Sequence, residues 1–197
     1  MCYKLLMRNI ANFLFETGML KRTPRSGFQF LGSGDESVAE HIFRTLYIGY
    51  VLGKLSNGVR IDRLIKMCLF HDLPEARTGD LNYVNKKYVD ANEGKAVNDL
   101  TKNLFFGEEI RALIAEFNEG KTDEAQLARD ADQIEMILSL KEYKDLGNKY
   151  AEEWLEFSIK RLQTDTAREL ANIILDTDSS HWWFSEKGEW WVSGGKQ

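Results

Sequence analysis

The residues of this sequence that could carry out chemistry are concentrated in the segment Phe70-His71-Asp72-Leu73-Pro74-Glu75. A run of apolar residues with helical spacing precedes it, so the adjacent histidine and aspartate stand at the end of a buried helix. Ionisable side chains are unfavourable to bury without a partner. A divalent metal ion would satisfy the pair, and so would a hydrogen bond within the core; this segment alone leaves both open.

Further ionisable residues lie at buried positions of two other predicted helices. His41 follows Val38 by one helical turn, which places it on or beside the buried face of its helix. Such a histidine could be a metal ligand or a hydrogen-bonded core residue. In a later helix, Asp130 and Asp132 each align with apolar residues, and helical periodicity does not choose between them.

Two polar segments could supply groups that contact a ligand. The first is rich in glycine and contains Arg25 and Phe28, which could receive a phosphate and a base or could belong to a solvated loop. The second is expected to be a loop from Pro74 to Asp80, because proline disfavours helical backbone in the residue before it. Glu75 lies in this loop, directly beyond the His-Asp pair.

The elements that must position these residues have the 3.6-residue period of amphipathic helices, and no segment shows the convincing alternation of a strand. Ser37 and Glu40 match the capping box at the start of one helix, whose core residues are expected to include Phe43 and Val51. The predicted helices span about 3–15, 38–55, 61–72, 93–103, 108–117, 123–146, 150–162 and 166–175. We therefore predict an all-α fold.

The end of the chain contains two aromatic clusters, His181–Phe184 and Trp190–Val192, on either side of a Lys-Gly pair. They could form a small hairpin, cap the core or lie at a subunit interface. We therefore expect one domain over residues 1–180 and a short aromatic C-terminal tail over residues 181–197.

The bulk composition limits the classes of partner. A length of 197 residues suits one domain with a sizeable core. The net charge is −5 and no basic cluster stands out, which argues against a nucleic-acid polymer and leaves room for a small anionic ligand. No apolar run reaches the roughly 18 residues of a membrane span, and the N-terminus lacks a signal pattern. Cys2 and Cys68 are the only cysteines, so no disulfide framework is expected and the predicted location is the cytoplasm.

The order of the candidate residues, a histidine, then a His-Asp pair, then an aspartate on a further helix, resembles the HD-domain superfamily of metal-dependent phosphohydrolases. This resemblance implies that the helices form a compact HD-domain bundle. Over roughly residues 1–165 the motifs are similar to those of the 5′-deoxynucleotidase branch, namely Arg25-Ser26-Gly27-Phe28, Glu36–His41, His71–Glu75, Thr78-Gly79-Asp80 and Ala131–Met136.

The same resemblance implies that one divalent metal ion is bound by His41, His71, Asp72 and Asp132, and it favours Asp132 over Asp130. Two imidazole nitrogens and two carboxylate oxygens suit Mn, Co, Fe or Zn. An octahedral ion would keep two positions for a water and a phosphate oxygen. Metal binding would lower the pKa of that water from about 15.7 towards neutrality.

The resemblance also implies roles for residues that do not bind the metal. Glu75 would transfer a proton, Arg25 would bind the phosphate through its fork-shaped donors, and Asp80 would accept the 3′-hydroxyl of the sugar. Phe28 occupies a position that is commonly tryptophan in the family. Phenylalanine can stack or shield but has no indole N–H to donate, so this position departs from the family pattern.

The function implied by the resemblance is removal of the 5′-phosphate from deoxyribonucleoside 5′-monophosphates, by a homodimer. One alternative is an HD phosphohydrolase of another small phosphate ester or a signalling nucleotide. The other is a protein that binds a metal or a nucleotide without turnover. The presence of Glu75 beside a complete set of ligand-type residues weighs against the second alternative.

Overall fold

The structure, a computed structural model, describes residues 3–185, 188 and 190–194, and the regular elements within these residues are helices. The predicted all-α class is confirmed, since this part of the chain contains no strand and only an isolated antiparallel bridge joins Pro24 to Ser37 there. None of the described helices is both long enough and apolar enough to cross a membrane.

The long helices begin and end close to their predicted bounds. In chain order the elements are α1 Tyr3–Thr17, η1 Gly18–Lys21, α2 Phe28–Leu31, α3 Val38–Leu55, α4 Ile61–Phe70, α5 Glu75–Thr78, η2 Asn85–Lys87, α6 Glu93–Thr101, α7 Gly107–Glu119, α8 Asp123–Asp145, α9 Lys149–Ile159, α10 Asp165–Asp176, α11 His181–Phe184 and α12 Trp190–Ser193, where η denotes a 3₁₀ helix.

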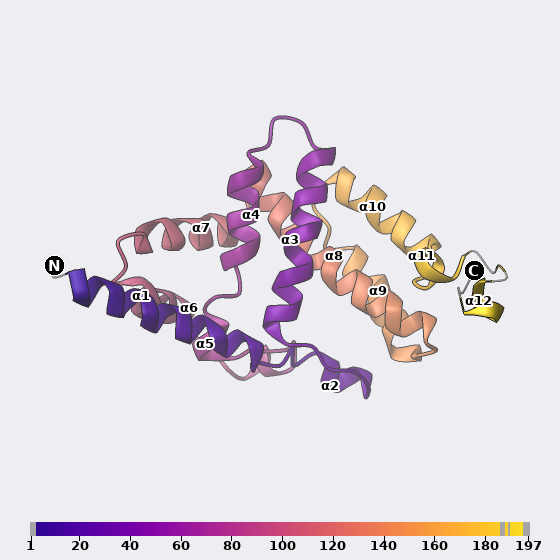
Figure 1. Cartoon of the computed structure of the whole chain (residues 1–197), viewed down its shortest axis with the longest axis horizontal. Helices are drawn as coiled ribbons and strands as arrows, with labels where there is room; N and C mark the ends of the chain where they lie inside the picture. The colour runs from indigo at the N-terminus through magenta and orange to yellow at the C-terminus, as the bar shows by residue number, and fades with distance from the viewer. Residues whose placement is uncertain (1–2, 186–187, 189, 195–197) are drawn as a thin grey trace.

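Helices α3, α4 and α8 form the centre of the molecule, because α3 packs against both of the others and α4 packs against α8 (Figure 1). Helices α1, α5, α6 and α7 lie on one side of this centre, and α9 and α10 lie on the other (Figure 1). Gly49 lets α3 approach α4 closely, since a β-carbon there would lie 2.7 Å from Sγ of Cys68. The three central helices are therefore held close together.

Apolar side chains form two core clusters that both include residues of α3. One cluster joins α3 to α4, α8 and the helices that follow, and contains the fully buried Leu52 and Ile134. The other joins the first turns of α3 to α1, α6 and α7, and contains Val38 and Ile42. Packing therefore fixes α3 along its length, including the turn that carries His41.

Local signals explain where the central helices begin and end. The predicted capping box is present: the Ser37 hydroxyl accepts from the backbone N–H of Glu40, whose carboxylate accepts from the N–H of Ser37. Helix α4 ends at Phe70 with His71 as its C-cap, as Pro74 predicts. The expected loop from Pro74 to Asp80 is wrong in part, because Glu75–Thr78 form the helical turn α5. The fixed φ of proline, which ends one helix, also suits the start of the next.

Two residues that were expected in the core lie on the outer side of α3. Phe43 is 62% exposed and Val51 is 43% exposed. The ring of Phe43 contacts the ring of Tyr47 edge to face, and Tyr47 is also 62% exposed. The apolar residues of α3 therefore extend beyond the face that the rest of the chain covers. Periodicity alone could not predict which of them are buried.

The small hairpin considered for the tail is not formed by its described residues, which make the helical turns α11 and α12 instead. The carboxylate of Asp178 accepts from the N–H and hydroxyl of Ser180, a local turn that leads into α11. The rings of Trp183 and Trp191 then meet at a centroid distance of 5.7 Å. Residues 186, 187, 189 and 195–197 of the predicted tail lie outside the described residues.

Candidate metal centre and active site

His41 is fully buried on α3, and its two ring nitrogens have different partners. Nδ1 lies 2.6 Å from Oε2 of Glu135 on α8. Because an ionised carboxylate can only accept, Nδ1 carries a proton and donates it. Nε2 is therefore the nitrogen that can bind a ligand or a second proton, and it lies 3.1 Å from Oδ1 of Asp132.

His71, at the C-terminal end of α4, is oriented in the same way by an uncharged group. Its Nδ1 lies 2.9 Å from the backbone carbonyl oxygen of Cys68, which can only accept. Its Nε2 lies 3.3 Å from Nε2 of His41. Two Nε2 atoms at this distance repel each other unless a proton or a metal ion lies between them, so the arrangement calls for a positive charge at this point.

Two carboxylates surround the facing nitrogens. Oδ2 of Asp72 lies 3.3 Å from Nε2 of His71 and 3.5 Å from Nε2 of His41. One ligand atom each from His41, His71 and Asp132 lie within 4.8 Å of one another. The structure therefore brings the four residues predicted as metal ligands together, from α3, from α8 and from the end of α4.

The charges in this cluster stabilise one another. Burial alone would lower the pKa of His41, but hydrogen bonds with Asp132 and Glu135 raise it to about 10. Burial alone would also lower the pKa of His71, but the negative charge of Asp72 raises it above its ordinary value. Burial alone would raise the pKa of Asp72 and Asp132, but the histidines lower it. The cluster therefore favours a positive charge held between carboxylates.

Asp130 lies on a different face of α8 and has a structural role. It is fully buried, and its carboxylate accepts from the backbone N–H groups of Gln163 and Thr164 at 2.7 and 2.9 Å. It also accepts from the hydroxyl of Thr164, the N-cap residue of α10. Asp130 therefore joins α8 to the start of α10, which leaves Asp132 as the aspartate of this pair that faces the histidines.

Glu135 and Arg44 are residues of the site to which the sequence analysis gave no role. Oε2 of Glu135 accepts from His41, and its Oε1 accepts from Nε and Nη2 of Arg44 at 3.0 and 2.7 Å. Burial alone would raise the pKa of Glu135, but the hydrogen bond with His41 lowers it to about 2. The spacing of Glu135, one helical turn after Asp132, indicates that both lie on the same side of α8. Its partners could not be predicted, because they are more than ninety residues away in the chain.

Arg25 reaches the cluster from the segment before α2. Its Nη1 lies 3.5 Å from Oδ2 of Asp72, and its Nε lies 4.0 Å from Oε2 of Glu36. Burial would lower the pKa of the guanidinium, but Asp72 and Asp132 raise it further above its ordinary value. Arg25 is therefore a fixed cation beside the facing histidines.

Glu75 is the first residue of α5, and one of its oxygens, Oε2, is buried without a hydrogen-bond partner within the described part of the chain. Burial, together with the negative charges of Asp72 and Asp80, raises the pKa of Glu75 to about 9. The side chain is therefore protonated at neutral pH in this arrangement. A carboxyl group that can hold a proton lies next to the predicted metal ligands.

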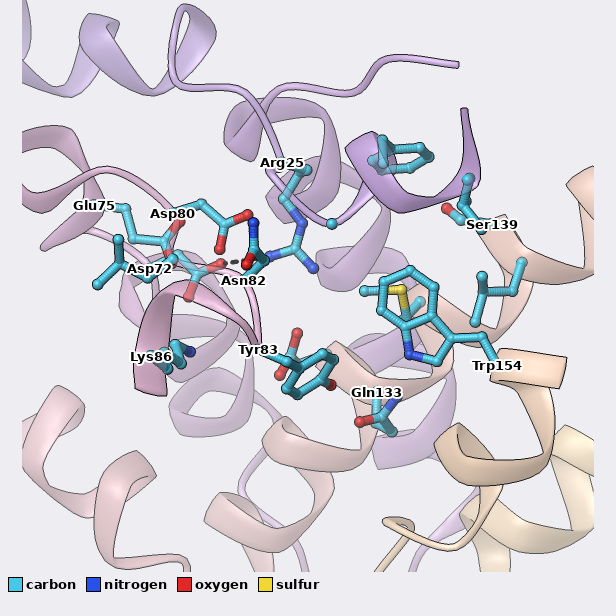
Figure 2. Close-up of a pocket in the computed structure, with 17 residues that line it drawn as sticks. Arg25, Asp72, Glu75, Asp80, Asn82, Tyr83, Lys86, Gln133, Ser139 and Trp154 are labelled. Atoms are coloured by element: carbon cyan, nitrogen blue, oxygen red, sulfur yellow. Dashed lines mark hydrogen bonds and ion pairs between the residues drawn. The ribbon is translucent and has the colours of Figure 1, made fainter. Parts of the chain in front are cut away.

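One pocket brings these groups together (Figure 2). Of the predicted residues, those that line it are Arg25, Phe28, Asp72, Glu75, Asp80 and Asp132. Oδ2 of Asp80 accepts from the backbone N–H of Ser26 at 2.6 Å, which ties this carboxylate to the segment that carries Arg25. The pocket also has aromatic and amide groups that the sequence analysis did not assign, notably Tyr83, Gln133 and Trp154.

Comparison with known families and proteins gives consistent results. A family model described as "HD domain" matches residues 17–174. The 5′-deoxynucleotidase HDDC2 of Bos taurus is 32% identical over 148 residues, which are 72% of this chain and 71% of the relative. The 5′-deoxynucleotidase HDDC2 of Dictyostelium discoideum is 35% identical over 150 residues, which are 70% of this chain and 79% of that relative.

A solved structure shares the fold. A conserved hypothetical protein from Pyrococcus furiosus superposes with a TM-score of 0.72 and 29% sequence identity, covering 85% of this chain and 99% of that one. The fold is therefore common to most of this chain and to that protein.

Proposed function

Because the chain belongs to the HD domain family, we propose that it is a phosphohydrolase that removes the 5′-phosphate from deoxyribonucleoside 5′-monophosphates. The chain is an enzyme of the hydrolase class, and its relatives over most of its length are 5′-deoxynucleotidases. The resemblance that the sequence motifs indicate is thus confirmed at the level of the family.

The observation that supports this proposal most directly is the composition of one pocket. A fixed cation, Arg25, and a protonated carboxyl, Glu75, line the same pocket as two carboxylates of the ligand-type cluster, Asp72 and Asp132. A phosphate monoester needs a cation for its oxygens, a Lewis acid and a proton source, and the pocket offers residues suited to each.

The residues present fit a divalent metal ion. The Nε2 atoms of His41 and His71 lie 3.3 Å apart, with both Nδ1 protons directed at acceptors, so a cation at this point would relieve their repulsion. We propose His41, His71, Asp72 and Asp132 as its ligands, a donor set that suits Mn, Co, Fe or Zn. When bound, such an ion supplies Lewis acidity towards the phosphate ester.

The chain's own residues then bind the substrate. Arg25 directs its guanidinium N–H donors at the phosphate oxygens, and its position beside Asp72 keeps them at the cluster. Asp80 is held by Ser26, so its carboxylate can accept the 3′-hydroxyl of the sugar from a fixed position. Phe28 lines the same pocket, where its apolar ring can shield a bound substrate from solvent.

Glu75 moves the proton. Burial raises its pKa, which favours the protonated carboxyl, and its buried Oε2 has no hydrogen-bond partner among the residues that the structure describes. It can therefore donate that proton to the 5′-oxygen as the bond from this oxygen to phosphorus breaks and a water oxygen forms the new bond to phosphorus; general acid catalysis of this kind contributes about 10²–10⁴-fold.

The test is release of inorganic phosphate from dAMP, AMP and dATP in the presence of Mn or Co. We expect turnover of dAMP and little of the other two. Glu75→Gln should retain the metal and bind dAMP, yet lose on the order of 10²-fold or more in kcat. Turnover of dATP alone would point to a different phosphohydrolase, and near-normal kcat in the variant would remove Glu75 from the mechanism.

We also propose that the active species is a homodimer that forms through the outer face of α3. Phe43, Tyr47 and Tyr50 form an exposed apolar stripe there, 62%, 62% and 51% exposed, because they recur at helical spacing. Tyr47→Glu should shift the sedimentation coefficient to that of a monomer. An unchanged dimer, or a wild-type monomer, would contradict this assembly.

Two further parts of the proposal concern organisation and location. We propose that residues 1–180 form the catalytic domain and that residues 181–197 are an added tail; the family match to residues 17–174 supports this division. We propose a cytoplasmic location, in keeping with Cys68, which is buried as a free thiol.

A further inference from the structure

One side of the pocket contains groups that the proposed reaction does not use. In the view of Figure 2, Asp72, Glu75 and Asp80 lie at the left of the pocket, whereas Tyr83, Gln133 and Trp154 lie below and to the right. These last three come from the turn before η2, from α8 and from α9, so the fold brings them together from distant parts of the chain.

The aromatic pair is fixed by its neighbours. The rings of Tyr83 and Trp154 meet edge to face, with centroids 6.0 Å apart and planes at 66°. The guanidinium of Arg161 lies 4.4 Å from the centroid of the Tyr83 ring, a cation–π contact that holds this ring from one side. A β-carbon on Gly27 would come within 3.0 Å of Cη2 of Trp154, so glycine lets the Arg25 segment lie against the indole.

The surroundings of this pair are suited to a flat, weakly polar group. Tyr83 is 45% exposed, and apolar side chains of Leu31, Met136 and Leu140 line the same pocket. Gln133 on α8 has an uncharged amide and lies below the two rings in Figure 2. An aromatic heterocycle would gain stacking and dispersion contacts here, in the same pocket as Arg25, which is proposed to bind the phosphate that the sugar connects to it.

We propose that Tyr83 and Trp154 form a stacking subsite for the nucleobase of the substrate, with the amide of Gln133 as its hydrogen-bonding group. This inference rests on the proposed function, because it names the part of a nucleotide that this side of the pocket receives. An amide offers both a donor and an acceptor, and stacking accepts any base, so the subsite supplies affinity for purines and pyrimidines alike.

The test compares dAMP with 2-deoxyribose 5-phosphate, which has the sugar and phosphate but no base. Wild type should have the lower KM for dAMP. Trp154→Leu should raise KM for dAMP about tenfold relative to the KM for deoxyribose phosphate, the scale of one lost base–aromatic stack. Tyr83→Leu, in an exposed turn, should act in the same direction, so the test does not depend on one variant.

The matched control is Phe157→Leu, which changes another aromatic residue of α9 that is 60% exposed and does not line this pocket. It should leave both KM values unchanged. Calorimetric binding of dAMP provides a readout that does not need turnover. Weaker dAMP binding in Trp154→Leu without turnover in wild type would support the subsite and contradict the proposed function. Equal KM for both substrates in wild type, or variants that match the control, would overturn the subsite and leave the proposed function intact.

Discussion

Among single residues, Glu135 has the clearest influence on a proposed metal ligand, because its carboxylate holds the Nδ1 proton of His41. An anion at this position makes Nε2 a stronger donor and fixes the ring in one tautomer. His71 has only the neutral carbonyl of Cys68 in the same place. The two histidines are therefore unequal, and His41 should be the stronger ligand of the pair.

We predict that Glu135→Gln lowers the affinity for Mn or Zn by about 10- to 100-fold, because the amide keeps the shape and an acceptor but removes the charge. A competition titration with a metal-binding dye measures this. The matched control is Glu142→Gln, since Glu142 pairs with the same Arg44 but does not touch a histidine. Equal affinities of the two variants would contradict the role given to Glu135.

The carboxyl of Glu75 predicts a pH effect on stability in metal-free protein. Its pKa is raised from 4.5 to about 9 by burial and by Asp72 and Asp80, so the folded state holds its proton where the unfolded state has lost it. Between these two values the unfolded state binds fewer protons, and stability therefore falls as the pH rises. Below about pH 4.5 both states are protonated and the effect disappears.

Glu75→Gln should therefore unfold at a higher temperature than wild type at pH 8, and by a smaller margin at pH 5. The amide cannot ionise, so the destabilising deprotonation is removed. Thermal melts in EDTA at the two pH values measure the margin. A margin that does not change with pH would mean that the carboxyl ionises normally in the folded protein.

At the scale of helices, substitution of the two aspartates of α8 should have different effects: loss of Asp130 should lower stability, and loss of Asp132 should abolish metal binding. Asp130→Ala leaves two backbone N–H groups and the hydroxyl of Thr164 without their acceptor, which should destabilise the protein by about 2–4 kcal/mol. It should still retain metal. Asp132→Ala should fold and lose metal, because a proposed ligand is gone. Chemical denaturation and elemental analysis of both variants provide the check, and the reverse pattern would exchange their roles.

Helix α8 also shows why sequence could predict an element and not its faces. The apolar spacing predicts a helix over about 123–146, yet this helix is buried on several sides at once. Asp130, Glu135 and Lys141 are all buried, so polar residues do not mark its solvent face. Only the motif favoured Asp132 over Asp130, because the partners of each aspartate come from helices far away in the chain.

Features that depend on neighbouring residues in the sequence could be predicted, and features that depend on contacts with distant parts of the chain could not. The capping box at Ser37 and the end of α4 before Pro74 need only neighbouring residues, and both are present. The exposure of Phe43 depends on what covers α3, and the contact between the Trp183 and Trp191 rings joins two separate turns of the tail. Tyr83 and Trp154 are more than seventy positions apart in the chain, so no local sequence pattern predicts their contact.

At the scale of the whole molecule, the proposed ligands connect all three central helices. His41 lies on α3, His71 at the end of α4 and Asp132 on α8. An ion bound by all of them would bind the folded chain and not the unfolded one, so it should stabilise the fold by mass action. We predict that saturating Mn raises the midpoint of thermal unfolding and that EDTA reverses the change. His71→Ala, which lacks one ligand, should show little response to either.

The 3.3 Å separation between the Nε2 atoms of His41 and His71 also has a consequence for the solution around the protein. Without metal, the raised pKa of His41, about 10, means that a proton occupies this position at physiological pH. An incoming cation must expel that proton, so loading is an exchange with a defined stoichiometry. Adding metal to a weakly buffered sample should acidify it, and the calorimetric heat should vary with the ionisation enthalpy of the buffer. Lowering the pH should therefore weaken metal binding, because protons compete for the same nitrogen.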